Sequence, residues 1–141
     1  IKRYLRFYSI KKVDGILADL GVSSHQFDEA ERGFSTRFDA DLDMRMNQSG
    51  ALSAFEVINK YGEEKLANVL FNYSELRNAK DISRRIVEKR AEEKIKTSFQ
   101  LKEVLEAFVP KSQEHKVLAQ IFQGIRIEVN QEIKRIFIAG A

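Results

Sequence analysis

The sequence contains no cysteine and no tryptophan, one proline and two histidines among its 141 residues. The absence of cysteine excludes a disulfide scaffold and a thiolate metal site. His25 and His115 lie far apart in the chain, so we expect surface histidines and no metal site. No apolar run approaches the roughly 18 residues of a membrane span. We therefore expect a cytoplasmic chain with no membrane partner.

With 43% hydrophobic and 32% charged residues, the chain can bury one core, or one good core and a partial one. The net charge of +3 is modest and does not by itself indicate a nucleic-acid partner.

A short apolar run followed by a carboxylate and a turn of small residues stands near the start of the chain. Residues 15–19 predict a buried strand that ends at Asp19, and Gly21, Ser23 and Ser24 follow directly. In open α/β sheets, ligands bind at the carboxyl ends of strands. An aspartate at such a position is also a common turn former or helix N-cap, so both readings stay open.

The next segment, residues 26–46, mixes aromatic, acidic and arginine residues without any helical or strand period. A stretch of this length without secondary structure is usually functional or disordered. Its phenylalanines, methionines and Leu42 carry too much apolar surface for a solvated chain. We therefore expect a packed functional loop.

Six blocks of the sequence together resemble the RsmH (MraW) methyltransferases, in that family's order and at about its spacing. They are residues 13–28 (VDGILADLGVSSHQFD), 31–35 (ERGFS), 42–46 (LDMRM), 56–59 (EVIN), 86–90 (IVEKR) and 122–130 (FQGIRIEVN). The resemblance implies S-adenosyl-L-methionine as cofactor and transfer of its methyl group to the N4 amine of a cytidine in 16S ribosomal RNA. The implied partner is that RNA or the small ribosomal subunit.

The resemblance also implies that this chain is an internal fragment. In the family a Gly-rich cofactor turn and a ribose-binding acid precede the strand at residues 15–19, and none of the seven glycines here forms a Gly-x-Gly run. The chain departs from the family at three further places. Thr36 stands where the family has an aromatic residue, Ala40-Asp41 where it has Gly-Pro, and Gly124 where it has alanine. A glycine within a helix costs about 1 kcal/mol relative to alanine, which predicts a weaker helix at Gly124.

Amphipathic spacing predicts a series of helices after residue 50. Capping boxes at Ser53/Glu56 and Thr97/Gln100 mark two starts, and Pro110 marks an end. The expected helices cover residues 53–61, 63–73, 80–93, 97–108 and 113–136.

We therefore predict a mainly α fold, with a helical insertion subdomain of four to five helices at residues 50–112. The resemblance implies that pieces of an incomplete Rossmann-like α/β methyltransferase domain flank it. These are residues 1–49, with one helix, one strand and the motif loop, and residues 113–141, with a returning helix.

The candidate catalytic residues are Asp19, Ser23 and Ser24. The resemblance places cofactor contacts at Asp19 and Gln26. Asp19 would accept a hydrogen bond from the cofactor or the target amine, and the two serines could orient the base, since positioning carries much of such a reaction.

The candidate RNA-binding residues are basic and come from three parts of the chain: Arg45, Arg84, Arg85, Lys89 and Arg126. Structural ion pairs are an alternative for Arg45 and Arg126, and a solvated helix face is an alternative for the others. Asn130 is a weaker candidate, and core packing is expected for Phe34 and Phe38.

Two other function classes remain at this point: a helical RNA-binding module without catalysis, and an interaction fragment without a ligand. We expect the isolated chain to be inactive and to bind cofactor weakly or not at all. Unpaired edges of the strand and the wide apolar stripe of the last helix predict a homodimer or a larger species. The alternative is that the last helix folds onto the strand within one chain.

Overall fold

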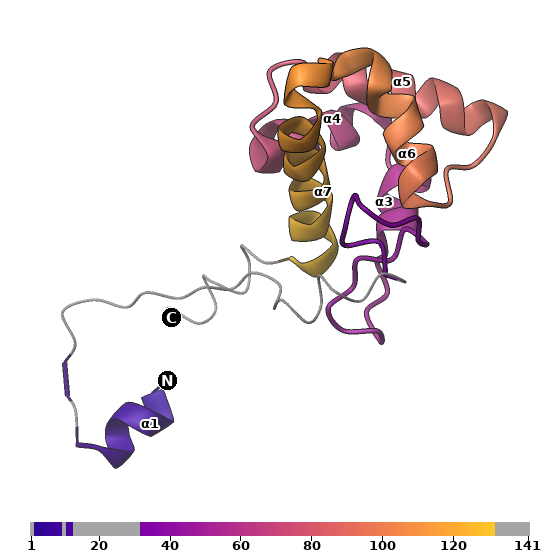
Figure 1. The fold of residues 1–141 in the computed structure, drawn as a ribbon. Helices are drawn as coiled ribbons and strands as arrows, with labels where there is room; N and C mark the ends of the chain where they lie inside the picture. Colours follow the sequence, from indigo (N-terminus) through magenta and orange to yellow (C-terminus); the bar gives the residue numbers. More distant parts are fainter. Residues whose placement is uncertain (1, 10, 13–31, 132–141) are drawn as a thin grey trace.

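The computed structural model describes residues 2–9, 11–12 and 32–131, and within these ranges the chain is mainly helical (Figure 1). The helices are α1 (Lys2–Phe7), α3 (Ala54–Lys60), α4 (Glu63–Ser74), α5 (Ala79–Glu92), α6 (Ser98–Leu105) and α7 (Glu114–Asn130). Short 3-10 turns at Glu106–Phe108 and Lys111–Gln113 join α6 to α7. The predicted strand at residues 15–19 lies outside the described residues, which contain only an isolated bridge between Asp41 and Thr97.

The predicted helix starts are confirmed by their capping interactions. At α3 the Ser53 backbone N–H donates to Glu56 Oε2 over 3.0 Å. At α6 the Thr97 side chain accepts from the Gln100 backbone N–H, while Gln100 Oε1 accepts from the Thr97 N–H. Each pair satisfies amides that the first helical turn leaves without an intrahelical acceptor.

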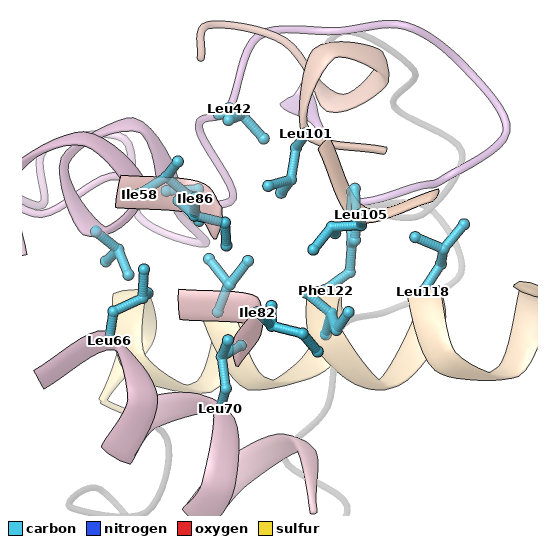
Figure 2. Packing of buried hydrophobic residues seen from close by; sticks show 14 of the residues in the cluster. Leu42, Ile58, Leu66, Leu70, Ile82, Ile86, Leu101, Leu105, Leu118 and Phe122 are labelled. Carbon is cyan, nitrogen blue, oxygen red and sulfur yellow. The ribbon is translucent and has the colours of Figure 1, made fainter. Parts of the chain in front are cut away.

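One hydrophobic core is shared by the helices α3, α4, α5, α6 and α7, and Figure 2 shows side chains from these five helices meeting in it. Its fully buried members include Ile58, Leu66, Leu70, Ile82, Ile86, Leu101, Leu105, Ile121 and Ile125. Burying one such side chain contributes about 1.5–3 kcal/mol, so these helices stabilise one another far more than their own propensities do. α4 packs against both α5 and α7.

The last helix is shorter than its apolar pattern predicts. Gln131 adopts a left-handed conformation (φ 49°, ψ 42°), so α7 ends at Asn130 and the predicted end at residue 136 is wrong. The apolar stripe of α7 is buried within the chain, with Leu118, Ile121 and Phe122 at most 4% exposed. This described part of the helix therefore offers no uncovered stripe for a second copy.

Gly124 lies at the crossing of α7 and α4. A Cβ atom added there would lie 1.9 Å from the Ser74 Oγ and 3.2 Å from the Ser74 Cβ. The glycine thus allows the two helices to approach closely. Packing between helices, which a propensity argument does not consider, explains its place in the middle of α7.

The end of α3 is tied to α7 by a side-chain hydrogen bond. The Tyr61 hydroxyl donates to Glu128 Oε1 over 2.7 Å. Burial and then this acceptor raise the pKa of Tyr61 well above its usual value. Lys65 of α4 also contacts this tyrosine, with its ammonium 3.7 Å from the centre of the Tyr61 ring.

Candidate functional site

The predicted catalytic and cofactor residues Asp19, Ser23, Ser24 and Gln26 lie outside the described residues. The structure describes the second half of the motif loop, residues 32–50, and the helices around it. Figure 1 shows this loop beside α3 and the C-terminal half of α7.

The loop is packed, as its apolar content predicts. Phe34, Leu42 and Met44 are 6%, 2% and 0% exposed. Gly33 has a φ of +68°, and a Cβ there would lie 2.4 Å from the Asp41 carbonyl oxygen. Glycine is therefore required where the two arms of the loop come together.

The middle of the loop is pinned to the start of α6. The Ser98 hydroxyl donates to the Phe38 carbonyl over 2.9 Å and accepts from the Ala40 N–H over 3.1 Å. The Ser98 N–H donates to the Ala40 carbonyl, and the Phe99 N–H donates to Asp39 Oδ1. These bonds use amides at the N-terminus of α6 that would otherwise need water or another acceptor.

Asn130 clamps the loop to the end of α7. Its Oδ1 accepts from the Met46 N–H over 2.7 Å, and its Nδ2 donates to the carbonyls of Met44 (2.8 Å) and Arg126 (2.9 Å). The side chain is 5% exposed. Both amide hydrogens are thereby used within the chain, which indicates a structural role for Asn130.

Arg45 is held in a similar way. Its Nε and Nη2 donate to the two carboxylate oxygens of Asp43 (2.5 and 3.1 Å), and its Nη1 donates to the carbonyls of Gln48 and Gly50 (both 2.9 Å). Burial opposes ionisation of Asp43, but the hydrogen bonds and charge of Arg45 hold the pKa of that carboxyl below its usual value. This geometry favours the ion-pair alternative for Arg45, and RNA contact by Arg45 stays a prediction.

Arg32 supports the same loop. Its Nη2 donates to the Arg45 carbonyl, and its guanidinium lies 5.2 Å from the centre of the Phe34 ring.

A pocket of about 670 Å³ lies between the loop and α7, and we call it the loop–α7 pocket. Phe34, Met44 and Phe122 are its buried apolar residues. Its polar lining residues come from both sides: Ser35, Thr36, Arg37, His115, Gln123 and Arg126. Of the predicted RNA-binding residues, only Arg126 lines this pocket.

Phe38 corrects one prediction. It is 51% exposed and lines the loop–α7 pocket, so its assignment to the core is wrong, whereas that of Phe34 is confirmed. The Ser98 hydroxyl holds the Phe38 carbonyl at the start of α6, and the Phe38 ring stays exposed.

Sequence reasoning missed Arg37, His115 and Gln123 as pocket residues. The signal was present in α7, since positions 115, 119, 122, 123 and 126 share one face at helical spacing. On this face the sequence predicts Phe122 as part of the apolar stripe, His115 as a surface residue and Arg126 as an RNA contact. The opposite wall of the pocket is formed by the folded loop, which helical spacing alone does not reveal.

The predicted basic face of α5 is accompanied by carboxylates. Arg84 lies 3.6 Å from Glu63, Arg85 lies 3.8 Å from Glu88, and Lys89 lies 2.9 Å from Glu92. Exposed pairs of this kind contribute little to stability but lower the local positive charge. The solvated-face alternative is favoured, and RNA contact by Arg84, Arg85 and Lys89 stays a prediction.

Arg90, on the same helix, has a structural role. Its two terminal nitrogens donate to the carbonyls of Ile58 (2.6 Å) and Tyr61 (2.5 Å) at the end of α3. Desolvation by burial lowers the pKa of Arg90.

Over the part of the chain that the structure covers, no group of three or more His, Asp or Glu side chains is arranged to hold a metal ion. Within the same part, the helices are too short or too polar to cross a bilayer.

Comparison with known proteins places this site in a family context. Residues 1–139 match the MraW methylase family. A protein from Christiangramia forsetii named ribosomal RNA small subunit methyltransferase H is 61% identical over 95% of this chain and 44% of its own length. Proteins of the same name from Flavobacterium johnsoniae and Bacteroides thetaiotaomicron are 62% and 46% identical, over 94% and 96% of this chain. The chain spans less than half the length of these relatives.

Proposed function

The chain belongs to the MraW methylase family, and we propose that it forms part of a ribosomal RNA methyltransferase. The reaction would transfer a methyl group from S-adenosyl-L-methionine to the N4 amine of a cytidine in 16S ribosomal RNA. The observation that carries this proposal is the match over residues 1–139, together with 61% identity to a relative named for methylation of small-subunit RNA.

The proposed roles of the motif residues follow from what such a transfer requires. The N4 lone pair must face the methyl carbon, a proton must leave the nitrogen, and the base must be held outside any stack. We assign cofactor contacts to Asp19 and Gln26, and positioning of the base to Ser23 and Ser24. The cofactor supplies a methyl group on a sulfonium, which leaves as a neutral thioether.

The described loop fits a role in holding substrate in a fixed geometry. Arg45 and Asn130 each use several hydrogen bonds to fix its backbone, and Phe34 and Met44 anchor it in the core. A rigid support keeps site residues within the small tolerance that group transfer demands.

The proposed setting is the bacterial cytoplasm, with the small ribosomal subunit or its RNA as partner. Flanking segments 1–49 and 113–141 would belong to a Rossmann-like methyltransferase domain, and residues 50–112 would form a helical insertion in it. A homodimer remains part of the proposal, resting on the strand predicted around residues 15–19.

A chimaera tests the function directly. The 141 residues replace the matching stretch of one of the longer relatives, and tritiated S-adenosyl-L-methionine is supplied with small ribosomal subunits lacking the modification. We expect label in 16S RNA as N4-methylcytidine, identified by mass spectrometry of nucleosides. Label on another atom or another RNA would contradict the proposal.

The same chimaera tests the motif residues. Asp19→Asn should lower the rate about 10- to 100-fold, because a charged hydrogen bond contributes about 1.5–3 kcal/mol. Glu103→Gln, which removes a carboxylate charge from the exposed side of α6, is the matched control and should leave the rate unchanged. Equal rates for the two variants would remove Asp19 from the site.

A further inference from the structure

We propose that the loop–α7 pocket binds one nucleotide of a single-stranded RNA, with the base on Phe38 and a phosphate at Arg37. The inference deepens the proposed function and rests on it, because that function supplies RNA as the ligand. It assigns RNA contact to Arg37, Phe38, His115 and Gln123, in addition to Arg126.

The shape and composition of the pocket suit a flat ring that carries an anionic group. Its volume of about 670 Å³ falls within the roughly 300–1,000 Å³ typical of ligand sites. Phe34, Met44 and Phe122 give it buried apolar walls, and Phe38 adds an aromatic ring that is 51% exposed. Unpaired bases of RNA stack on such rings.

The charged side chains among the described lining residues, Arg37 and Arg126, are both cationic. His115 also lines the pocket, and none of the described lining residues is a carboxylate. Asp39 follows Phe38 in the sequence and Glu114 precedes His115, but both acids have contacts elsewhere. Asp39 accepts from the Phe99 N–H, and Glu114 lies 3.0 Å from the Lys102 ammonium. On α5, carboxylates lie within 4 Å of Arg84, Arg85 and Lys89, whereas none of the described lining residues of the pocket brings a carboxylate to Arg37. Among the described residues, this pocket is therefore the better phosphate site.

An exposed aromatic ring beside the cations favours RNA over an acidic peptide. A phosphate or a glutamate side chain would satisfy Arg37 alike, but only a nucleotide also supplies a π-face for Phe38. Competition between these two kinds of ligand is therefore part of the test.

The first experiment measures anisotropy of an end-labelled oligocytidylate mixed with the 141-residue chain. Phe38→Ala should weaken binding at least about fivefold, the low end of measured base–aromatic stacking. Phe71→Ala is the matched control, since Phe71 is 61% exposed on α4 and does not line the pocket. It should leave the affinity unchanged.

The second experiment repeats the measurement across a salt series. Arg37→Gln should reduce the slope of log affinity against log salt by about 0.7, the value for one phosphate contact on a single strand. Arg77→Gln removes the same charge from an exposed position outside the pocket and should leave the slope unchanged. Circular dichroism melting checks that all four variants keep the fold.

Competitors identify the ligand. Cytidine monophosphate should displace the labelled RNA at high concentration. Polyglutamate, added at the same concentration of negative charge, should displace it less well. Equal displacement by polyglutamate, equal losses for Phe38→Ala and Phe71→Ala, or absence of RNA binding would each overturn the proposal. None of these binding measurements requires methyl transfer. An inactive chimaera would therefore reject the enzyme function, while RNA binding at this pocket is still tested by the 141-residue chain.

Discussion

At position 124 the absence of a side chain matters more for packing than for helix propensity. We expect Gly124→Ala to lower the free energy of unfolding by up to about 2 kcal/mol, because overpacking costs about 1–3 kcal/mol and the substitution gains back about 1 kcal/mol in helix propensity. Urea denaturation measures the change. In a Ser74→Ala background the Oγ that lies 1.9 Å from the added Cβ is gone, so the loss should shrink. An identical loss in both backgrounds would contradict the packing explanation.

A second residue-scale prediction concerns the loop clamp. Asn130→Ala should destabilise the chain by about 2–4 kcal/mol, since it leaves the Met46 N–H and the Met44 carbonyl without their buried partner. Asn72→Ala, which removes an exposed amide from α4, is the control and should change stability by less than about 0.5 kcal/mol. Thermal melting of both variants gives the comparison, and equal melting temperatures would show that the clamp is unimportant.

The Asp43–Arg45 pair predicts a pH dependence of stability. The folded-state pKa of Asp43 is lowered, so the pair stabilises the fold above the unfolded-state pKa of about 3.9 and this contribution is lost as pH falls through the folded-state value. Asp43→Asn should therefore be less stable than the parent at pH 7, and the difference should shrink from about pH 5 downward. Urea midpoints across this range measure it, with Glu103→Gln on the exposed side of α6 as control. A difference that does not vary with pH would contradict the prediction.

At the scale of elements, the helices follow from local signals and their ends follow less well. Capping boxes predict the starts of α3 and α6, and the observed ends of α4 and α5 lie within one residue of their predicted bounds. α7 ends where Asn130 bonds Met44 and Met46 of the loop, and the next residue, Gln131, is left-handed. A pattern of apolar residues carries no information about that contact.

The α5 face gives an element-scale prediction. Arg84 and Arg85 already lie within 4 Å of carboxylates, so Arg84→Gln/Arg85→Gln should weaken oligocytidylate binding less than Arg37→Gln alone. The anisotropy assay makes the comparison on one chain. A larger loss from the double variant would place the RNA on α5, as its sequence predicts.

For the whole molecule, burial of the α7 stripe changes the argument for self-association. Ile121 and Ile125 are fully buried against the chain's own helices, so the dimer prediction now depends on the strand expected at residues 15–19. Light scattering at micromolar concentration measures the mass against the 16.3 kDa of one chain. We expect twice that mass, with backbone protection of residues 15–19 in hydrogen exchange. A monomer in which those residues are protected would show that one chain satisfies its own strand.

The sequence by itself determined the helical segments, their caps, the packed loop and the family, because these depend on local spacing and on motifs that survive without coordinates. Only the tertiary structure decided which side chains are available to bind a ligand. Arg45 and Asn130 look like ligand residues in the sequence, but their hydrogen bonds hold the loop, whereas Phe38 reads as core and lies exposed beside Arg37. The physical reason is that pairing and burial depend on contacts between residues distant in the chain, such as Met44 with Asn130 and Phe38 with Ser98, which no local pattern specifies.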